Sequence, residues 1–227
     1  MIIKKNDFVE LQFTAKTSEG TIFDTNIAED AKKINLKMEP RPLVICIGQG
    51  MILPAIDEFL AEKELGKYNL KLEAKKAFGE RKRELVRVMP ISIFASQKQA
   101  PYPGMVFQFD NMLGKISSVS GGRVIVDFNN PIAGKDVEYS LIVKRIIENV
   151  KEKIKSLMLA FFGSEIPFKL ENEKLTLEVN KGFKPLFENF KPKFKEILNL
   201  ELEIVEKEEK KNMQENQEEK KKEKESI

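Results

Sequence analysis

GQGMILPAI, residues 48–56, is the stretch that decides the fold, because here an apolar strand gives way to a helix. Residues 43–47 (LVICI) are apolar on both faces, which predicts an inner strand. The two glycines then break the strand, and Pro54 stands in the first turn of the following helix, where its missing N–H costs nothing. We predict that this helix spans residues 52–65 and that Gly66 is its C-cap.

On both sides of this stretch, alternating apolar and polar residues predict half-buried strands. Residues 7–16 alternate most clearly, with Phe13 on the apolar face and Thr14 on the polar face. Further strands are predicted at residues 22–24, 68–72 and 137–147, and a short helix is predicted around residues 28–36.

From residue 84 onward the chain is rich in short strand-like runs that are separated by glycine. Gly114 and the pair Gly121-Gly122 divide these runs, and residues 91–99 are interpreted as helix or loop. The runs are residues 85–88, 105–109, 115–119 and 123–128. Together they predict a small β-rich insert.

The remainder of the chain predicts a separate α+β module. An amphipathic helix begins near Val150 and stops near Gly163, and a hairpin covers residues 168–179. Residues 200–204 alternate as a last strand, and the charged residues 206–227 are expected to be disordered. One helical face carries four phenylalanines, in a helix that Pro192 should kink or split: Phe183, Phe187, Phe190 and Phe194. We interpret this stripe as the core of the module, with self-association as the alternative.

Composition excludes several kinds of chemistry. The chain has 227 residues, of which 41% are hydrophobic and 33% charged, and its net charge of +3 gives no strong bias toward nucleic acid or anionic membrane. It has no histidine, which rules out Ser-His-Asp and Cys-His catalysis and zinc sites built on imidazole. No metal and no cofactor is expected.

Other features bear on the compartment. Cys46 is the only cysteine, so no disulfide can form within one chain, as suits a reducing cytoplasm. No run approaches the ~18 apolar residues of a membrane helix, and the N-terminus lacks the plan of a signal peptide. We expect a cytoplasmic protein that does not contact the membrane.

Four short segments occur in an order and at spacings that identify a family. They are GTIFDT at residues 20–25, GQGMILPAI at 48–56, AFGE at 77–80 and NNPIAGK at 129–135. Together they resemble the FKBP family of peptidyl-prolyl cis/trans isomerases, specifically its SlyD-like branch. The resemblance covers residues 4–147, and the stretch between the third and fourth segments is similar to the insert-in-flap domain of that branch. Longer members of the branch carry C-terminal extensions.

The resemblance implies a twisted antiparallel sheet wrapped around one short helix, with an apolar cavity between them. The fold class is therefore α+β, with an inserted β-rich domain and a C-terminal α+β module. The implied division is an isomerase domain at 1–80 plus 129–147, an insert at 81–128, a C-terminal domain at 148–205 and a tail at 206–227.

The resemblance also implies prolyl isomerase activity in an apolar site that needs no nucleophile or metal. The residues that correspond by position are Phe13, Phe23, Asp24, Leu43, Ile52, Leu53, Ile56, Phe78, Ile132 and Tyr139. Phe13 and Phe78 stand where many members have tyrosine, so two hydroxyls of the family pattern are missing. Ala55 replaces a glycine of that pattern, and Asn130 replaces a histidine.

The implied partners are unfolded or proline-containing polypeptides, which the insert binds and hands to the isomerase site. Candidate client-binding residues are Ile91, Ile93, Phe94, Tyr102, Met105 and Met112. The alternative is that most of these side chains form the core of the insert itself.

Several readings of function and assembly stay open. A chain with an altered site could act only as a non-catalytic holdase, and the C-terminal module could form a homodimer. The lysine-rich helix faces of that module are interpreted as solvated. Contact with RNA or the ribosome is disfavoured but left open.

Overall fold

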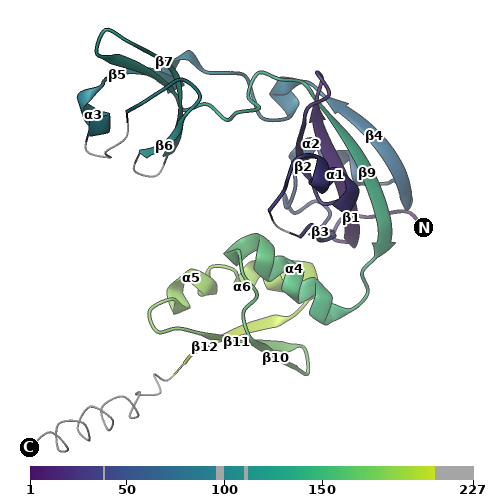
Figure 1. The fold of residues 1–227 in the computed structure, drawn as a ribbon. Helices are drawn as coiled ribbons and strands as arrows, with labels where there is room; N and C mark the ends of the chain where they lie inside the picture. The colour runs from purple at the N-terminus through teal and green to yellow at the C-terminus, as the bar shows by residue number, and fades with distance from the viewer. Residues whose placement is uncertain (38, 96–99, 110–111, 208–227) are drawn as a thin grey trace, which may run out of the picture. The chain divides into compact units, whose positions relative to one another are not determined.

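The computed structural model describes residues 1–37, 39–95, 100–109 and 112–207. The chain divides into two compact units, Met1–Glu148 and the residues from Asn149 onward (Figure 1). Both units mix helices and strands, as the sequence predicts. Most of the predicted disordered tail, from residue 208 on, lies outside the described residues, but Glu206 ends a β-strand, so the predicted start of the tail is wrong by one residue.

The first unit contains a five-stranded antiparallel sheet around β1 (Phe8–Thr17). The strand order is β2-β1-β9-β4, and β3 also pairs with β1 (Figure 1). The other strands are β2 (Ile22–Thr25), β3 (Leu43–Cys46), β4 (Gly66–Leu72) and β9 (Val137–Ile146). The long strands β1 and β9 pair along nearly their whole length, so they form the backbone of the sheet.

The predicted strand at residues 43–47 is correct, but the prediction that it is an inner strand is wrong. Among the described residues, β3 pairs with β1 alone, and Leu43 is 36% exposed. Only the end of the run is buried, at Ile45, Cys46 and Ile47. An apolar run of five residues cannot by itself distinguish a central strand from an edge strand with one buried end.

Helix α2 (Pro54–Leu60) is shorter than predicted. The N-terminal segment ends it, because Ile3 donates its N–H to the carbonyl of Lys63 (2.7 Å) and accepts from the N–H of Glu62 (2.9 Å). These bonds take the backbone groups that a longer helix would use. Gly66 begins β4 instead of capping the helix, so that prediction is wrong.

The main core lies between α2 and the sheet, and it takes side chains from α2, β1, β4 and β9. Its buried members include Leu11, Phe13, Ile56, Leu60 and Tyr139. The opposite face of β1 is also covered around Thr14, because α1 (Ala28–Lys33) packs there. Thr14, predicted on the polar face, is consequently only 2% exposed.

The insert forms a separate four-stranded antiparallel sheet in the order β5-β8-β7-β6. Its elements are η2 (Arg83–Leu85), β5 (Val86–Pro90), α3 (Ser92–Ala95), β6 (Val106–Phe109), β7 (Met112–Ser120) and β8 (Arg123–Asp127). Its core contains Phe94, Phe107, Ile116, Val124 and Val126. The insert thus has apolar packing of its own.

Gly114 does not divide two strands, as the sequence suggested, but lies within β7. A Cβ atom at this position would come within 2.5 Å of Val126 and 2.8 Å of Phe128. Glycine is therefore present because neighbouring side chains pack directly against the backbone.

The C-terminal unit has the predicted helix–hairpin–helix–strand order. Its elements are α4 (Val150–Phe162), β10 (Phe168–Glu171), β11 (Lys174–Val179), α5 (Lys184–Glu188), α6 (Lys191–Leu198) and β12 (Glu201–Glu206). Gly163 caps α4 with a φ of 70°, and Pro192 lies in the first turn of α6, so the predicted helix is split. The sheet order is β10-β11-β12, with β12 parallel to β11.

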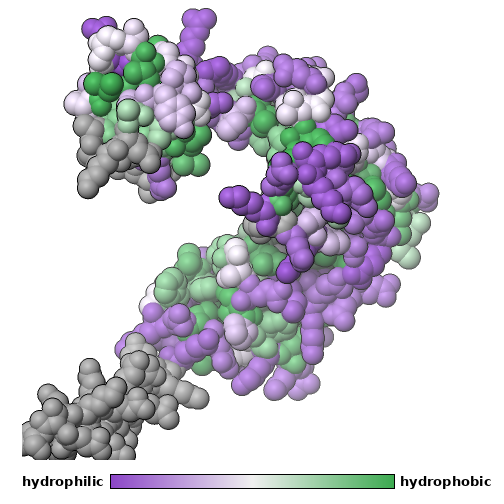
Figure 2. All heavy atoms as spheres, viewed as in Figure 1, coloured by the Kyte–Doolittle hydropathy of each residue, from purple (hydrophilic) through white to green (hydrophobic). Residues whose placement is uncertain are grey.

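The phenylalanine stripe of this unit is only partly core. Phe187 and Phe194 are buried, whereas Phe183 is 54% exposed. Figure 2 shows hydrophobic side chains on the visible surface of this unit, and its exposed large apolar residues include Leu159 and Leu186. In the part of the chain that the structure describes, every helix is too short or too polar to cross a membrane.

Candidate active site

Four aromatic rings meet on the core side of the main sheet. Phe23 on β2 packs edge-on against Phe78, with ring centroids 5.6 Å apart, and against Tyr139 on β9 at 6.3 Å. Phe13 on β1 lies 6.1 Å from Tyr139. Ile56 of α2 is fully buried in the same cluster. The result is an apolar, aromatic site between sheet and helix.

The strand register explains why Asp24 and Tyr139 belong to this site. Ala15 on β1 lies opposite Asp24 on one side and opposite Tyr139 on the other. Residues directly opposite one another in an antiparallel sheet point to the same face. The small side chain of Ala15 therefore lies between the carboxylate and the phenol.

The electrostatics of the site follow from partial burial. Partial burial raises the pKa of the Asp24 carboxyl, because it disfavours the charged form. A hydrogen bond from the backbone of Thr25 opposes this rise. Burial, and then the nearby charge of Asp24, raise the pKa of Tyr139 to about 12. The Tyr139 hydroxyl consequently keeps its proton at neutral pH and can donate a hydrogen bond.

The start of α2 supplies a backbone donor. Leu53 is the N-cap residue, and its carbonyl accepts from the N–H groups of Ile56 (2.9 Å) and Asp57 (3.1 Å). Its own N–H precedes the helix and has no acceptor within it. Ile52 and Leu53 are both partly buried and pack against the core.

Asp57 is a residue of this region that the sequence analysis missed. Its buried carboxylate accepts hydrogen bonds from the N–H groups of Gly48 (2.8 Å) and Gly50 (3.1 Å). It therefore clamps the glycine turn onto the helix that carries Leu53 and Ile56. The sequence does contain a signal for this contact. An acidic residue stands in the first turn of a helix that follows Gly-x-Gly, and such a glycine turn offers N–H donors to a carboxylate.

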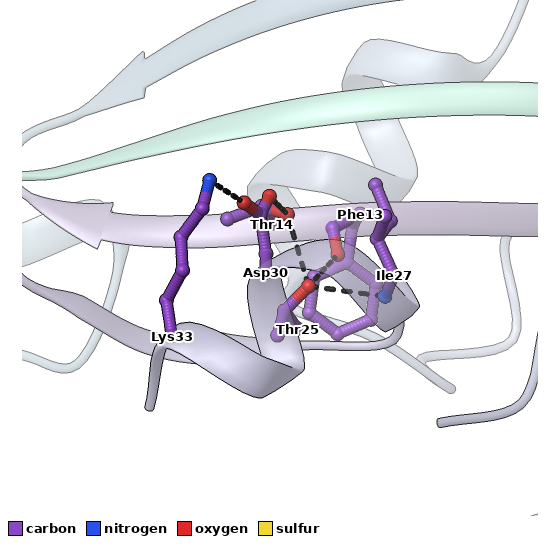
Figure 3. Close-up of polar contacts among 6 residues, drawn as sticks. All are labelled: Phe13, Thr14, Thr25, Ile27, Asp30 and Lys33. Atoms are coloured by element: carbon purple, nitrogen blue, oxygen red, sulfur yellow. Dashed lines mark hydrogen bonds and ion pairs between the residues drawn. The ribbon is translucent and has the colours of Figure 1, made fainter. Parts of the chain in front are cut away.

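A polar network joins β1 to β2 and α1 on the face of β1 that carries Thr14 (Figure 3). Thr14 Oγ1 donates to Asp30 Oδ2 (2.6 Å) and lies 2.9 Å from Thr25 Oγ1. Thr25 Oγ1 also donates to the carbonyl of Phe13 (2.9 Å) and accepts from the N–H of Ile27 (3.1 Å). These bonds join β1, β2 and α1 at the residue that follows Asp24.

Two features reinforce this network. The Lys33 ammonium, and then the Thr14 hydroxyl, lower the pKa of Asp30 by hydrogen bonding to its carboxylate. The side chain of Asn26 accepts from Phe13 N (2.7 Å) and donates to the Leu11 carbonyl (2.9 Å). Asn26 thus occupies the edge of β1 between the positions where β2 and β3 pair with it.

Loops carry the remaining predicted residues. Phe78 follows η1 (Ala74–Lys76), and Ile132 lies in the loop before β9; both pack against the main core. The N–H of Gly134 donates to the carbonyl of Gly79 (2.8 Å), which joins the two loops.

The chain is similar in sequence to several known proteins. The sequence model described as "FKBP26, IF domain" matches residues 87–132. A "Short-type peptidyl-prolyl cis-trans isomerase" of Methanocaldococcus jannaschii is 27% identical over 149 residues, covering 64% of this chain and 94% of the relative. The "FKBP-type peptidyl-prolyl cis-trans isomerase SlyD" of Haemophilus influenzae is 23% identical, and that of Escherichia coli is 24% identical. Both alignments cover 68% of this chain, and 77% and 75% of the respective relatives.

The chain is thus similar to FKBP-type peptidyl-prolyl cis-trans isomerases over about two thirds of its length. The match to the IF domain falls on the inserted sheet, with bounds of 87–132 against the predicted 81–128. Nine of the ten residues inferred from the FKBP resemblance lie together: eight join or pack against the main core, and Asp24 faces Tyr139 across Ala15. Leu43 is the exception, because it is exposed at the end of β3 and is not part of that core cluster.

The candidate client-binding residues of the insert separate into two groups. Phe94 is only 1% exposed at the centre of the insert core, and Met105 packs against that core. Phe94 therefore does not belong to an exposed client-binding surface, and the sequence interpretation is corrected for it, whereas Met105 is only partly buried. The exposed members are Ile91, Ile93, Tyr102 and Met112.

Proposed function

We propose that this chain is a peptidyl-prolyl cis/trans isomerase that acts on unfolded or proline-containing polypeptides and has attached chaperone activity. The observation that carries the proposal is the cluster of Phe13, Phe23, Phe78 and Tyr139 beside Asp24. A proline ring is apolar and flat-sided, and it packs well against aromatic faces and edges. The relatives named as isomerases support the same activity.

The reaction needs no proton transfer from the substrate. Rotation about a peptide bond has a barrier of ~18–20 kcal/mol, because conjugation keeps the amide planar and polar. Conjugation is lost at the twisted midpoint, so an apolar site that binds this form better than the planar form lowers the barrier. A thousandfold acceleration requires only about 4 kcal/mol, within the range of shape fit and one or two hydrogen bonds.

The proposed roles follow the geometry. Phe23, Phe78 and Tyr139 hold the proline ring, and Ile56 forms the floor beneath it. The Leu53 N–H binds a substrate carbonyl. Asp24 acts through its charge on the twisted amide, at a position where partial burial reduces screening by water.

We propose the following organisation around this site. Residues 1–80 with 129–147 form the isomerase domain, and residues 81–128 form an insert that captures clients through its exposed apolar residues. Ile91 directly precedes α3 and Ile93 lies within it, Tyr102 lies between α3 and β6, and Met112 begins β7. Residues 148–205 form an additional module.

The test is catalysis of a proline-limited refolding reaction by the full chain and by Phe78→Ala. Phe59→Ala is the matched control, because Phe59 packs edge-on against Tyr68 at 5.8 Å and is likewise partly buried against the core. Both variants should lose about 2 kcal/mol of stability. Only Phe78→Ala should lower the catalytic efficiency, by about tenfold or more, since a ring contact is worth ~1 kcal/mol beyond burial.

The outcomes separate the proposal from a non-catalytic holdase. If the full chain suppresses aggregation but leaves the refolding rate unchanged, it is a holdase. If Phe59→Ala and Phe78→Ala reduce catalysis equally, the aromatic cluster is not the site.

A further inference from the structure

Two chain segments connect the insert to the isomerase domain, and polar side chains tie them together. We call this group the neck clasp and define it as Arg81, Lys82, Asp127 and Asn129. The Asn129 side chain accepts from the Lys82 N–H (2.8 Å) and donates to the Lys82 carbonyl (2.9 Å). It thereby pairs with both backbone groups of one residue, as a neighbouring strand would.

The second N–H of the Asn129 amide is also used. It donates to Asp127 Oδ1 (2.7 Å), which accepts from the Asn129 backbone N–H as well (3.0 Å). Asparagine is the side chain of this size that offers one acceptor and two donors in a single plane. Alanine would remove all three side-chain bonds, and aspartate at neutral pH would keep only the acceptor.

Asp127 is held in place on its other side. Its Oδ2 atom lies 2.5 Å from the Arg81 guanidinium. Burial favours the neutral form, but the hydrogen bonds from Asn129 and the charges of Arg81 and Lys115 outweigh it and lower the pKa of Asp127. The carboxylate therefore remains an acceptor for Asn129 at neutral pH.

The clasp is close to the candidate site along both segments. Phe78 lies four residues before Lys82, and Ile132 lies three residues after Asn129. The bond from Gly134 N to the Gly79 carbonyl (2.8 Å) is a second tie between the same segments. Both ends of the loop that carries Ile132 are thus hydrogen-bonded to the segment that follows Phe78.

We propose that Asn129 is a positioning residue that fixes Phe78 and Ile132 relative to each other. This inference rests on the proposed isomerase function for its effect on rate. The insert and the isomerase domain have separate cores, so loss of the clasp should leave both cores packed. What changes is the spacing of two side chains at the site, and a displacement of 1 Å can cost up to ~100-fold in rate.

The experiment compares the full chain with Asn129→Ala, Asn129→Asp and the control Asn69→Asp. Asn69 is exposed on β4, and its Oδ1 accepts from Ser140 Oγ (3.1 Å), a role that a carboxylate retains. Rates are measured on a short proline peptide in a protease-free assay. We expect Asn129→Ala to lower the catalytic efficiency by about tenfold and Asn69→Asp to leave it within about twofold.

The pH profile of Asn129→Asp distinguishes positioning from general destabilisation. The introduced carboxylate would face Asp127, with Lys82, Arg81 and Lys115 as the nearby cations. When protonated, it can again donate one hydrogen bond. Its activity relative to the parent chain should therefore rise by about threefold as pH falls from roughly 7.5 to 4.5.

Amide exchange at Gly134 provides a readout that does not depend on activity. The Gly134 N–H should exchange about tenfold faster in Asn129→Ala, because one of its two supporting ties is lost. An inactive parent chain would refute the proposed function, and the exchange rate would then decide on the clasp alone. Unchanged exchange, or a relative activity of Asn129→Asp that does not vary with pH, would overturn the positioning role.

Discussion

At the scale of single residues, two threonines on adjacent strands show how much depends on hydrogen-bond partners. Thr25 and Thr17 are 4% and 3% exposed, respectively. Thr25 Oγ1 bonds to Phe13, Thr14 and Ile27. Among the described residues, the buried Thr17 Oγ1 has no hydrogen-bond partner. The same replacement at the two positions therefore tests the network of Figure 3.

Thr25→Val should destabilise the chain by about 1–3 kcal/mol, because the partly buried N–H of Ile27 loses its acceptor and the buried carbonyl of Phe13 loses a donor. Thr17→Val should be neutral or stabilising, since it replaces an unpaired buried hydroxyl with a methyl group. Denaturant unfolding followed by circular dichroism measures both changes. Equal losses would mean that the network adds nothing beyond packing.

Asp24 should make the folded chain less stable at neutral pH. Its pKa is raised from the ordinary 3.8, so between 3.8 and the raised value the native state binds more protons than the unfolded state. Stability from this group therefore falls as pH rises through that window. Asp24→Asn should melt at a higher temperature than the parent chain at pH near 7, yet isomerise proline more slowly.

The pH dependence of this melting difference identifies its cause. It should shrink as pH falls below the window, because the carboxyl is then neutral in both states. Thermal melts of the two chains at several pH values measure it. A difference that stays constant with pH would show that charge at Asp24 is not responsible.

At the scale of elements, the glycine turn and helix α2 behave as one piece because Asp57 joins them. We expect Asp57→Ala to cost about 1–3 kcal/mol through two unsatisfied N–H groups. Catalysis should fall as well, since the turn precedes Leu53 and Ile56. Glu58→Ala, an exposed position on the same helix, is the control and should change stability by less than about 0.5 kcal/mol. Unfolding and refolding assays on both variants provide the measurement.

At the scale of elements, some of the predictions from sequence were correct and others were wrong. Strand β1, helix α4 and the split at Pro192 followed from periodicity and local breakers, which act over a few residues. The end of α2 and the burial of Thr14 did not, because Ile3 and α1 determine them from elsewhere in the chain. Only tertiary contacts could have revealed them.

The candidate site divides in the same way. Short motifs located Phe23, Asp24, Phe78 and Ile56, which the fold brings together. They could not locate Asp57 or the partners of Thr25, since nothing in a local pattern tells which backbone groups a side chain will meet. Leu43 was assigned by position in the same motifs, and its exposed place at the end of β3 could not be foreseen from a uniformly apolar run.

At the scale of the whole molecule, separate cores predict separable activities. Residues 84–126 can be replaced by a short glycine-serine loop while Lys82, Asp127 and Asn129 are kept. Catalysis on an unfolded protein should then fall by about tenfold or more, because client capture is lost and with it the raised local concentration of substrate. The rate on a short peptide should stay within about threefold. Comparing both substrates tests this, and equal losses would contradict transfer of clients from the insert.

Removal of the C-terminal unit should leave the isomerase site intact. Every residue of the main core cluster lies within Met1–Glu148. A chain that ends at Glu148 should therefore catalyse peptide isomerisation at about the same rate as the full chain. Side-by-side assays at equal concentration measure this, and a large loss would show that the C-terminal unit supports the site.

The parallel pairing of β12 with β11 has a consequence for biosynthesis. The ribosome releases the chain from its N-terminus, so α4, β10 and β11 emerge while the strand that must lie beside β11 is still inside the exit tunnel. Until Leu202 and Ile204 arrive, the apolar side chains that they cover stay open to solvent. By then the first unit has left the exit tunnel, and a working isomerase would already be tethered to its own unfinished C-terminal module.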